Sequence, residues 1–102
     1  MKTNEELRNA LADQYDEETL NEMVMFENPA YTSAVIGVSH ENRLIYSFEK
    51  MVECLMEEDG MEEEEAIEFI EYNTIRALPY IPNHPIIMYP IIDFSDLQKG
   101  GE

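Results

Sequence analysis

The feature that most constrains this fold is a stretch, Glu49 to Glu71, in which acidic residues are interleaved with apolar residues at helical spacing. Ser47 is a suitable N-cap for a first helix, and Gly60 supplies the residue expected just past its end. Apolar residues three and four positions apart mark one face of that helix: Phe48, Met51, Val52, Leu55 and Met56. A second helix is predicted from about 62 to 77 and closed by Pro79, with these inward residues: Ala66, Ile67, Phe69, Ile70, Thr74 and Ala77. The short connection predicts an antiparallel or steeply angled helical hairpin.

The segments before and after this hairpin favour β-structure. Residues 34–38 and 43–48 are rich in β-branched and aromatic residues and flank a short polar connection, which predicts a β-hairpin. Asn42 can take the left-handed turn position, and Gly37 indicates a bulge or a close neighbour. Ile86 to Tyr89 reads as one added strand, with Pro90 at its edge or end.

Two short helices are predicted at the N-terminus. Thr3 followed by Glu6 forms a capping-box signature for a helix over about 4–14, and Asp16 can cap a second helix that ends before Asn28-Pro29. The order ααββααβ predicts a single small α+β domain over 1–98, in which helices pack on a mainly antiparallel sheet, with 99–102 as a frayed tail.

The net charge of −17 is concentrated in the predicted helical hairpin. Eleven acidic residues and one basic residue between Glu49 and Glu71 give −10 in that stretch, which leaves −7 for the rest of the chain. Carboxylates in the first turn of the second helix suit the helix dipole, but Glu57, Glu58 and Asp59 lie at a helix C-terminus, where the dipole disfavours anions. Local helix stability therefore does not account for them.

Two interpretations of this charge remain open. Blocks of like charge are usually solvated faces that maintain solubility. Alternatively, rows of carboxylates spaced along two helices resemble a phosphate track and bind a positively charged protein surface. The candidate partner-binding residues are Glu49, Glu53, Glu57, Glu58, Asp59, Glu64, Glu68 and Glu71.

The C-terminal part suggests a different contact surface. Its aromatic residues Tyr80, Tyr89 and Phe94 either close the core or form a dimer or partner face, because tyrosine combines an apolar body with a polar tip.

Other function classes find little support in the residues. No nucleophile and base pair, phosphate-binding glycine loop or EF-hand loop is recognisable, and His40 and His84 lack partners at zinc-ligand spacing. We therefore expect no enzymatic activity, catalytic residue, metal or cofactor. Cys54 stands alone among carboxylates that raise a thiol pKa, so we expect an inert thiol in a reducing cytoplasm. A strongly negative surface disfavours direct binding to nucleic acid or membrane, and no apolar run could span a bilayer.

Part of the chain resembles a known group of proteins. The segments EEDGM (57–61), EEAIEFI (64–70), YNTIRALPY (72–80) and PIIMY (85–89), with the upstream residues 34–51, are similar to small acidic hypothetical proteins of Gram-positive bacteria and their phages. The similarity covers roughly positions 28 to 92. It implies a shared fold and transfers no activity.

The sequence thus predicts a non-enzymatic module whose hairpin over 49–71 binds a basic surface. A phage setting favours an inhibitor of a nucleic-acid-binding protein, of the DNA-mimic or anti-CRISPR kind. The alternative is a small housekeeping or structural protein that forms a homodimer through its Tyr/Ile-rich C-terminal segment, with charge serving solubility only.

Overall fold

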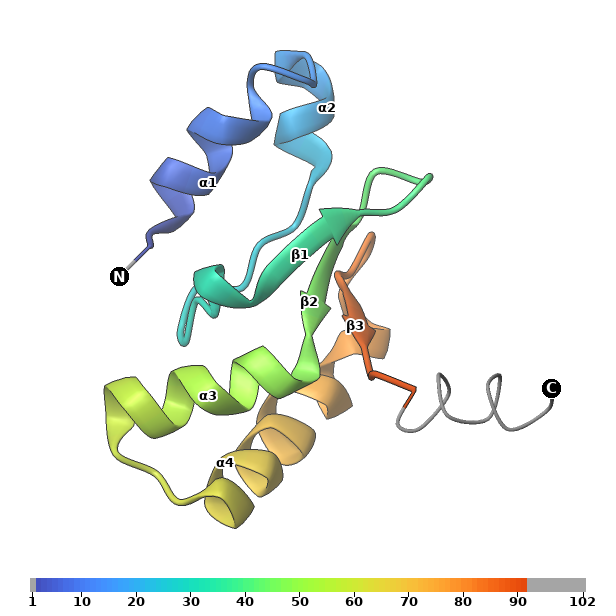
Figure 1. Ribbon diagram of the computed structural model, residues 1–102. Coiled ribbons are helices and arrows are strands. Elements are labelled where there is room, and N and C mark those ends of the chain that lie inside the picture. Colours follow the sequence, from blue (N-terminus) through green and yellow to red (C-terminus); the bar gives the residue numbers. More distant parts are fainter. Residues whose placement is uncertain (1, 92–102) are drawn as a thin grey trace, which may run out of the picture.

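The computed structural model of this protein describes residues 2–91, and its elements follow the predicted order (Figure 1). The helices are α1 (Asn4–Leu11), α2 (Glu17–Glu22), α3 (Phe48–Asp59) and α4 (Glu63–Phe69). Shorter turns are the 3₁₀ turn η1 (Thr32–Ala34), the π-helical turn η2 (Ile70–Thr74) and the 3₁₀ turn η3 (Ile75–Tyr80). The strands are β1 (Val35–Val38), β2 (Leu44–Ser47) and β3 (Ile86–Met88). The predicted α+β class is confirmed, whereas the predicted tail at 99–102 lies outside the described residues.

The three strands form one mixed sheet in the order β1-β2-β3. The predicted hairpin is confirmed: β1 and β2 pair antiparallel, Val38 opposite Leu44. The pairing of β2 with β3 is parallel, with Ile45 opposite Ile86, so the sheet is not mainly antiparallel. A parallel neighbour requires a long crossover connection, and here the helical hairpin supplies it.

Two backbone features of the β-hairpin agree with the sequence. The strand register shifts between Val35 and Gly37, which confirms the bulge, while a Cβ added at Gly37 would meet no neighbour within 4 Å. Asn42 occupies the left-handed region with φ of 64°. The left-handed geometry at Asn42 is one that asparagine tolerates better than most residues, whereas the backbone at Gly37 needs no positive φ.

The N-terminal helices are tied to the rest of the chain by polar contacts. The capping box of α1 is present, with the Glu6 N–H donating to Thr3 Oγ1 at 3.2 Å and the Thr3 N–H donating to Glu6 Oε1 at 3.1 Å. Asn4 then reaches the following loop, donating from Nδ2 to the Phe26 carbonyl at 2.8 Å. The helix ends at Leu11 rather than near residue 14, because the next residues form a turn.

Helix α3 buries most of the apolar stripe that the sequence predicts, but at its borders Cys54 is buried and Met56 is partly exposed. The Lys50 N–H donates to Ser47 Oγ at 3.3 Å, and Gly60 ends the helix in the left-handed region with φ of 69°, so both predicted caps are confirmed. Met56 is 39% exposed, while Cys54 is buried. These two residues lie on opposite borders of the stripe centred on Leu55, and the Cys54 border is covered by the chain around η1.

The second helix of the hairpin differs from the prediction after its second turn. The α-helical part ends at Phe69, and the chain widens into η2 before tightening into η3, which contains Pro79 rather than stopping before it. The Asn73 side-chain amide donates to the Phe69 carbonyl at 3.1 Å, thereby occupying an acceptor of the helix ladder. This competition is a physical reason for the π turn.

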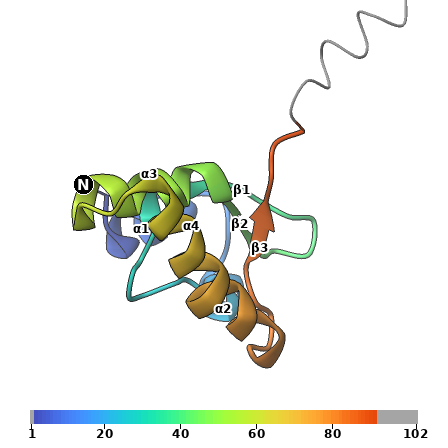
Figure 2. The same ribbon diagram turned by 90° about the horizontal axis from the view of Figure 1, so that it is seen from below.

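One hydrophobic core joins these elements. Seen from below (Figure 2), α4 is steeply inclined to α3, and the chain returns past η3 to the sheet at β3. Residues from the sheet, from both hairpin helices and from η2 have almost no exposed surface: Leu44, Tyr46, Met51, Leu55, Ala66 and Ile70. No helix among residues 2–91 has the length and apolar character needed to cross a membrane.

Gly60→Ala and Gly37→Ala test the backbone account. At Gly60 the positive φ of 69° strains any side chain, so we expect the free energy of unfolding to fall by about 1 kcal/mol. At Gly37 neither strain nor contact opposes a Cβ, so stability should stay the same or rise by about 0.4–1 kcal/mol. Urea unfolding of both variants measures the difference, and equal losses would contradict this assignment.

Candidate functional site

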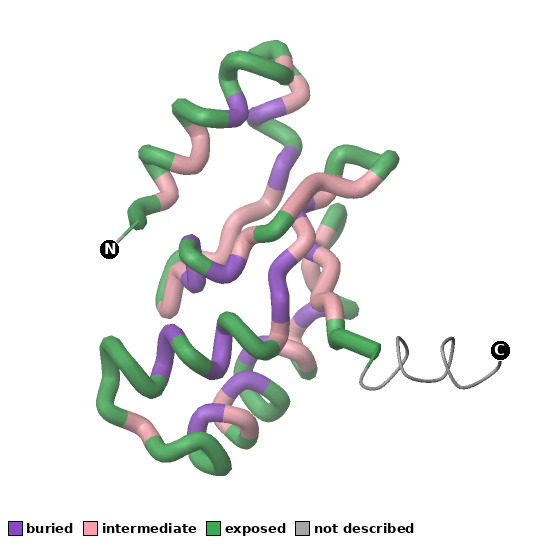
Figure 3. Tube along the Cα trace, in the orientation of Figure 1, coloured by how far each residue is buried: buried purple, intermediate pink, exposed green. Residues whose placement is uncertain are grey.

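The candidate acidic surface consists of the eight carboxylates predicted on the hairpin, and all of them are exposed (Figure 3): Glu49, Glu53, Glu57, Glu58, Asp59, Glu64, Glu68 and Glu71. The buried sides of the same helices belong to the core, including Met51 and Leu55 on α3 and Ala66 on α4. The carboxylates are thus carried on a packed scaffold rather than on an isolated helix.

Four carboxylates of this acidic surface line two hollows of the hairpin. Glu49 and Glu53 of α3 line a groove bounded by both helices and the end of β3. Glu68 and Glu71 line a second depression, around Tyr72. Glu71 is also within electrostatic reach of Tyr89, which lines the groove.

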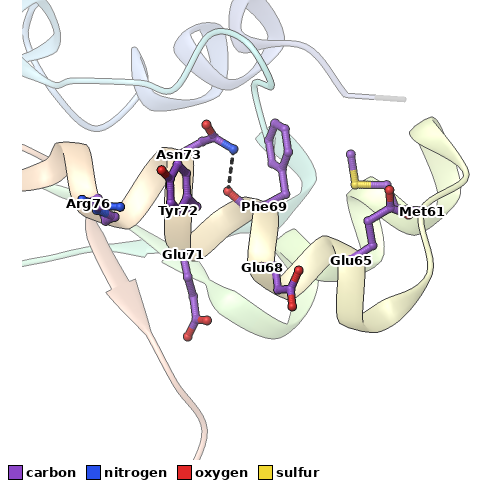
Figure 4. Close-up of a pocket in the computed structure, with 8 residues that line it drawn as sticks. All are labelled: Met61, Glu65, Glu68, Phe69, Glu71, Tyr72, Asn73 and Arg76. Carbon is purple, nitrogen blue, oxygen red and sulfur yellow. Dashed lines mark hydrogen bonds between the residues drawn. The ribbon is translucent and has the colours of Figure 1, made fainter.

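The Tyr72 depression combines acidic and aromatic side chains, as Figure 4 shows. The Glu68 and Glu71 side chains point to one side of the helix, whereas Phe69 points to the other. The Arg76 guanidinium lies over the Tyr72 ring, 4.7 Å from its centroid. The ring thus already holds a cation of this chain in cation–π geometry.

The groove between α3 and α4 is largely apolar and was not predicted from the sequence. It has a volume of about 350 Å³, and its walls include Val52, Met56 and Ile67. Phe48 stacks on Tyr89 at one end, with ring centroids 4.8 Å apart and an interplanar angle of 26°. Tyr89 and Met56 nonetheless remain 53% and 39% exposed. In the sequence, the signal for this groove is the position of Met56 at the border of the apolar stripe of α3.

The predicted C-terminal contact face is only partly described. Tyr80 is 86% exposed at the end of η3, while Tyr89 lies beside the groove after β3. Burial, and then the Glu71 carboxylate, raise the pKa of Tyr89. Phe94 lies outside the described residues. Tyr80 does not line the groove, so the structure does not bring these two tyrosines into one site.

Cys54 is buried in α3, and its pKa is raised as the sequence predicts. Desolvation is the largest cause, followed by the carboxylates of Glu58, Glu57 and Glu53. The native state therefore holds the thiol proton more tightly than the unfolded chain does. Cys54 favours the native state below the ordinary thiol pKa, and this contribution is lost as the pH rises through the raised value.

The two histidines lie in connecting segments. His40 is exposed in the β-hairpin turn, and Nδ1 of His84 lies 2.8 Å from the Pro85 carbonyl oxygen, to which it can donate. Within residues 2–91, no three His, Cys, Asp or Glu side chains form a group able to hold a metal ion.

Tyr31 is a strained residue that sequence reasoning did not single out. Its φ of 52° is in the left-handed region, its side chain is 4% exposed, and its hydroxyl lacks a hydrogen-bond partner among the described residues. Burial raises its pKa, and the nearby Thr74 hydroxyl of η2 partly offsets this without meeting hydrogen-bond geometry. Tyr31 and Thr74 line one small cavity, which places the segment before β1 beside the π turn.

Comparisons of the chain with protein-family models, with characterised proteins and with solved structures give no match. The geometry of the hairpin is therefore the basis for a functional proposal.

The reactivity of the Cys54 thiol reports the electrostatic effect of the nearby carboxylates. Neutralising two of the carboxylates that raise the Cys54 pKa, in the variant E57Q/E58Q, should lower that pKa and speed Cys54 alkylation under native conditions. The control variant E64Q/E68Q neutralises two carboxylates that are not among the causes of this shift. Alkylation rates across the alkaline range measure the effect, and equal rates in the two variants would contradict it.

Proposed function

We propose that this protein is a non-enzymatic binding module whose helical hairpin over 49–71 engages a basic protein surface. The observation that carries the proposal is that all eight predicted carboxylates are exposed while the opposite sides of α3 and α4 are packed in the core. A charged surface on a packed scaffold loses little conformational entropy on binding, which favours affinity.

The distribution of charge also supports a contact role. The hairpin segment carries −10 of the net −17, and its one basic residue is Lys50. A concentrated negative field speeds the approach of a positively charged partner and repels partners of like sign. It follows that the partner presents lysines and arginines on its surface, as nucleic-acid-binding proteins do.

Inhibition of a nucleic-acid-binding protein is the specific form of this function that we favour. Carboxylates three or four positions apart on a helix advance about 4.5–6 Å along the axis, whereas phosphates of one DNA strand advance about 3.4 Å. Flexible glutamate side chains can bridge that difference over short distances. Since Glu49 and Glu53 line one hollow and Glu68 and Glu71 line another, we expect the surface to replace short phosphate segments.

The second candidate is a homodimer formed through the C-terminal segment. The exposure of Tyr80, Tyr89 and Ile91 favours a contact surface there. Each copy carries a net charge of −17, however, so two copies repel one another unless their acidic hairpins point apart.

Charge reversal distinguishes the two candidates. The variant E64K/E68K/E71K reverses three exposed carboxylates of the hairpin, while the control variant E22K/E27K/E41K makes the same change in net charge at exposed positions elsewhere. With a fluorescent decalysine peptide as the basic probe at low salt, we expect about a tenfold or larger loss of affinity for the first variant only.

Equal losses of affinity in both variants would show that net charge alone attracts the probe, and would contradict a dedicated surface. Sedimentation of the same variants tests the second candidate, because a dimer formed through the C-terminal segment should persist in E64K/E68K/E71K. Far-UV circular dichroism of each variant checks that the fold is retained.

A further inference from the structure

We infer that the groove between α3, α4 and the end of β3 is a docking site for a basic amphipathic helix of the partner protein. This inference rests on the proposed function, since it specifies how a positively charged partner is held. It adds an apolar anchor to an interaction that the charges alone would leave non-specific.

The apolar residues that line the groove indicate that the apolar face of the partner helix lies inside it. Met56 from α3, Ile67 from α4 and Tyr89 from the chain after β3 contribute apolar surface from three separate elements. Partial exposure of Met56 and Tyr89 means that an apolar side chain inserted here would remove further hydrophobic area from water. An aliphatic side chain of the partner therefore fits against these apolar residues.

The charged residues around the groove indicate which side chains of the partner helix flank its apolar anchors. Glu49, Glu53 and Glu63 line the same groove, and all three side chains are exposed. Carboxylates around an apolar floor complement a segment whose leucine-like anchors are flanked by lysine or arginine. A helix presents such anchors at intervals of three and four residues, which is the common mode of recognition in hydrophobic grooves.

Two other occupants fit less well. A second copy of this chain would bring another net charge of −17 to a rim that is already acidic. An extended strand added beside β3 would find a short strand, Ile86–Met88, followed by Pro90, which lacks an N–H donor. Charge and backbone chemistry thus both favour a basic helix from a different protein.

Two synthetic peptides with equal numbers of lysines test the inference by calorimetry. One is oligolysine, and the other is a Leu/Lys peptide whose leucines form one helical face. We expect the wild-type protein to bind the Leu/Lys peptide more tightly. Tyr89→Ala should weaken that binding about tenfold and change oligolysine affinity less than twofold, because it removes the wall and no charge.

Tyr80→Ala is the matched control, since Tyr80 is 86% exposed and does not line the groove. It should leave the affinity for both peptides unchanged. Met56→Ala, which shortens an exposed wall residue without touching the Phe48–Tyr89 stack, is the second variant if Tyr89→Ala disturbs the fold. Amide chemical shifts of α3 and α4 should move when the Leu/Lys peptide binds.

The outcomes separate the two proposals. If the peptides bind equally well, or if Tyr80→Ala and Tyr89→Ala have equal effects, the groove is not the docking site while charge-dependent binding to the hairpin survives. If neither peptide binds, the proposed function fails together with this inference. Self-association that Tyr89→Ala abolishes would overturn the inference by assigning the groove to a second copy.

Discussion

The packing of α3 against α4 and the sheet is the constraint on which the rest of the structure depends. Leu55 of α3 and Ala66 of α4 are almost fully buried in one core with Tyr46 of β2. Each large apolar side chain buried there stabilises the fold by about 1.5–3 kcal/mol. The same hairpin is also the crossover that makes β3 parallel to β2, so sheet topology and helix packing depend on one set of side chains.

This packing allows the outer side of the hairpin to carry charge that does not serve the fold. Glu57, Glu58 and Asp59 occupy the C-terminal end of α3, where the helix dipole opposes anions. Glu57 and Glu58 also contribute to the raised pKa of the buried Cys54 thiol. A solubility role needs charge anywhere on the surface. The binding role that we propose needs charge on a fixed scaffold, and the carboxylates of the hairpin are exposed on packed helices.

The sequence predicts those features that depend on local chemistry. The capping residues Thr3 and Ser47, the bulge at Gly37 and the stop at Gly60 are confirmed, because each acts within a few positions of itself. The parallel pairing of β3 was missed, since it depends on where a long crossover returns the chain. The π turn was missed although the Asn73–Phe69 contact is local, because helical periodicity does not distinguish a π turn from a continued α-helix. The groove beside Met56 was missed because residues from three separate elements form it.

The central claim is that the acidic residues at the end of α3 oppose the stability of the fold rather than serve it. The free energy of unfolding of the variant E57Q/E58Q/D59N, measured in urea at low salt, tests this claim most directly. Removing anions from the C-terminal end of α3 should raise the free energy of unfolding by about 1 kcal/mol relative to the wild type, since both the helix dipole and repulsion between like charges are relieved. A fall in that free energy would show that these carboxylates serve the fold, and would contradict the account.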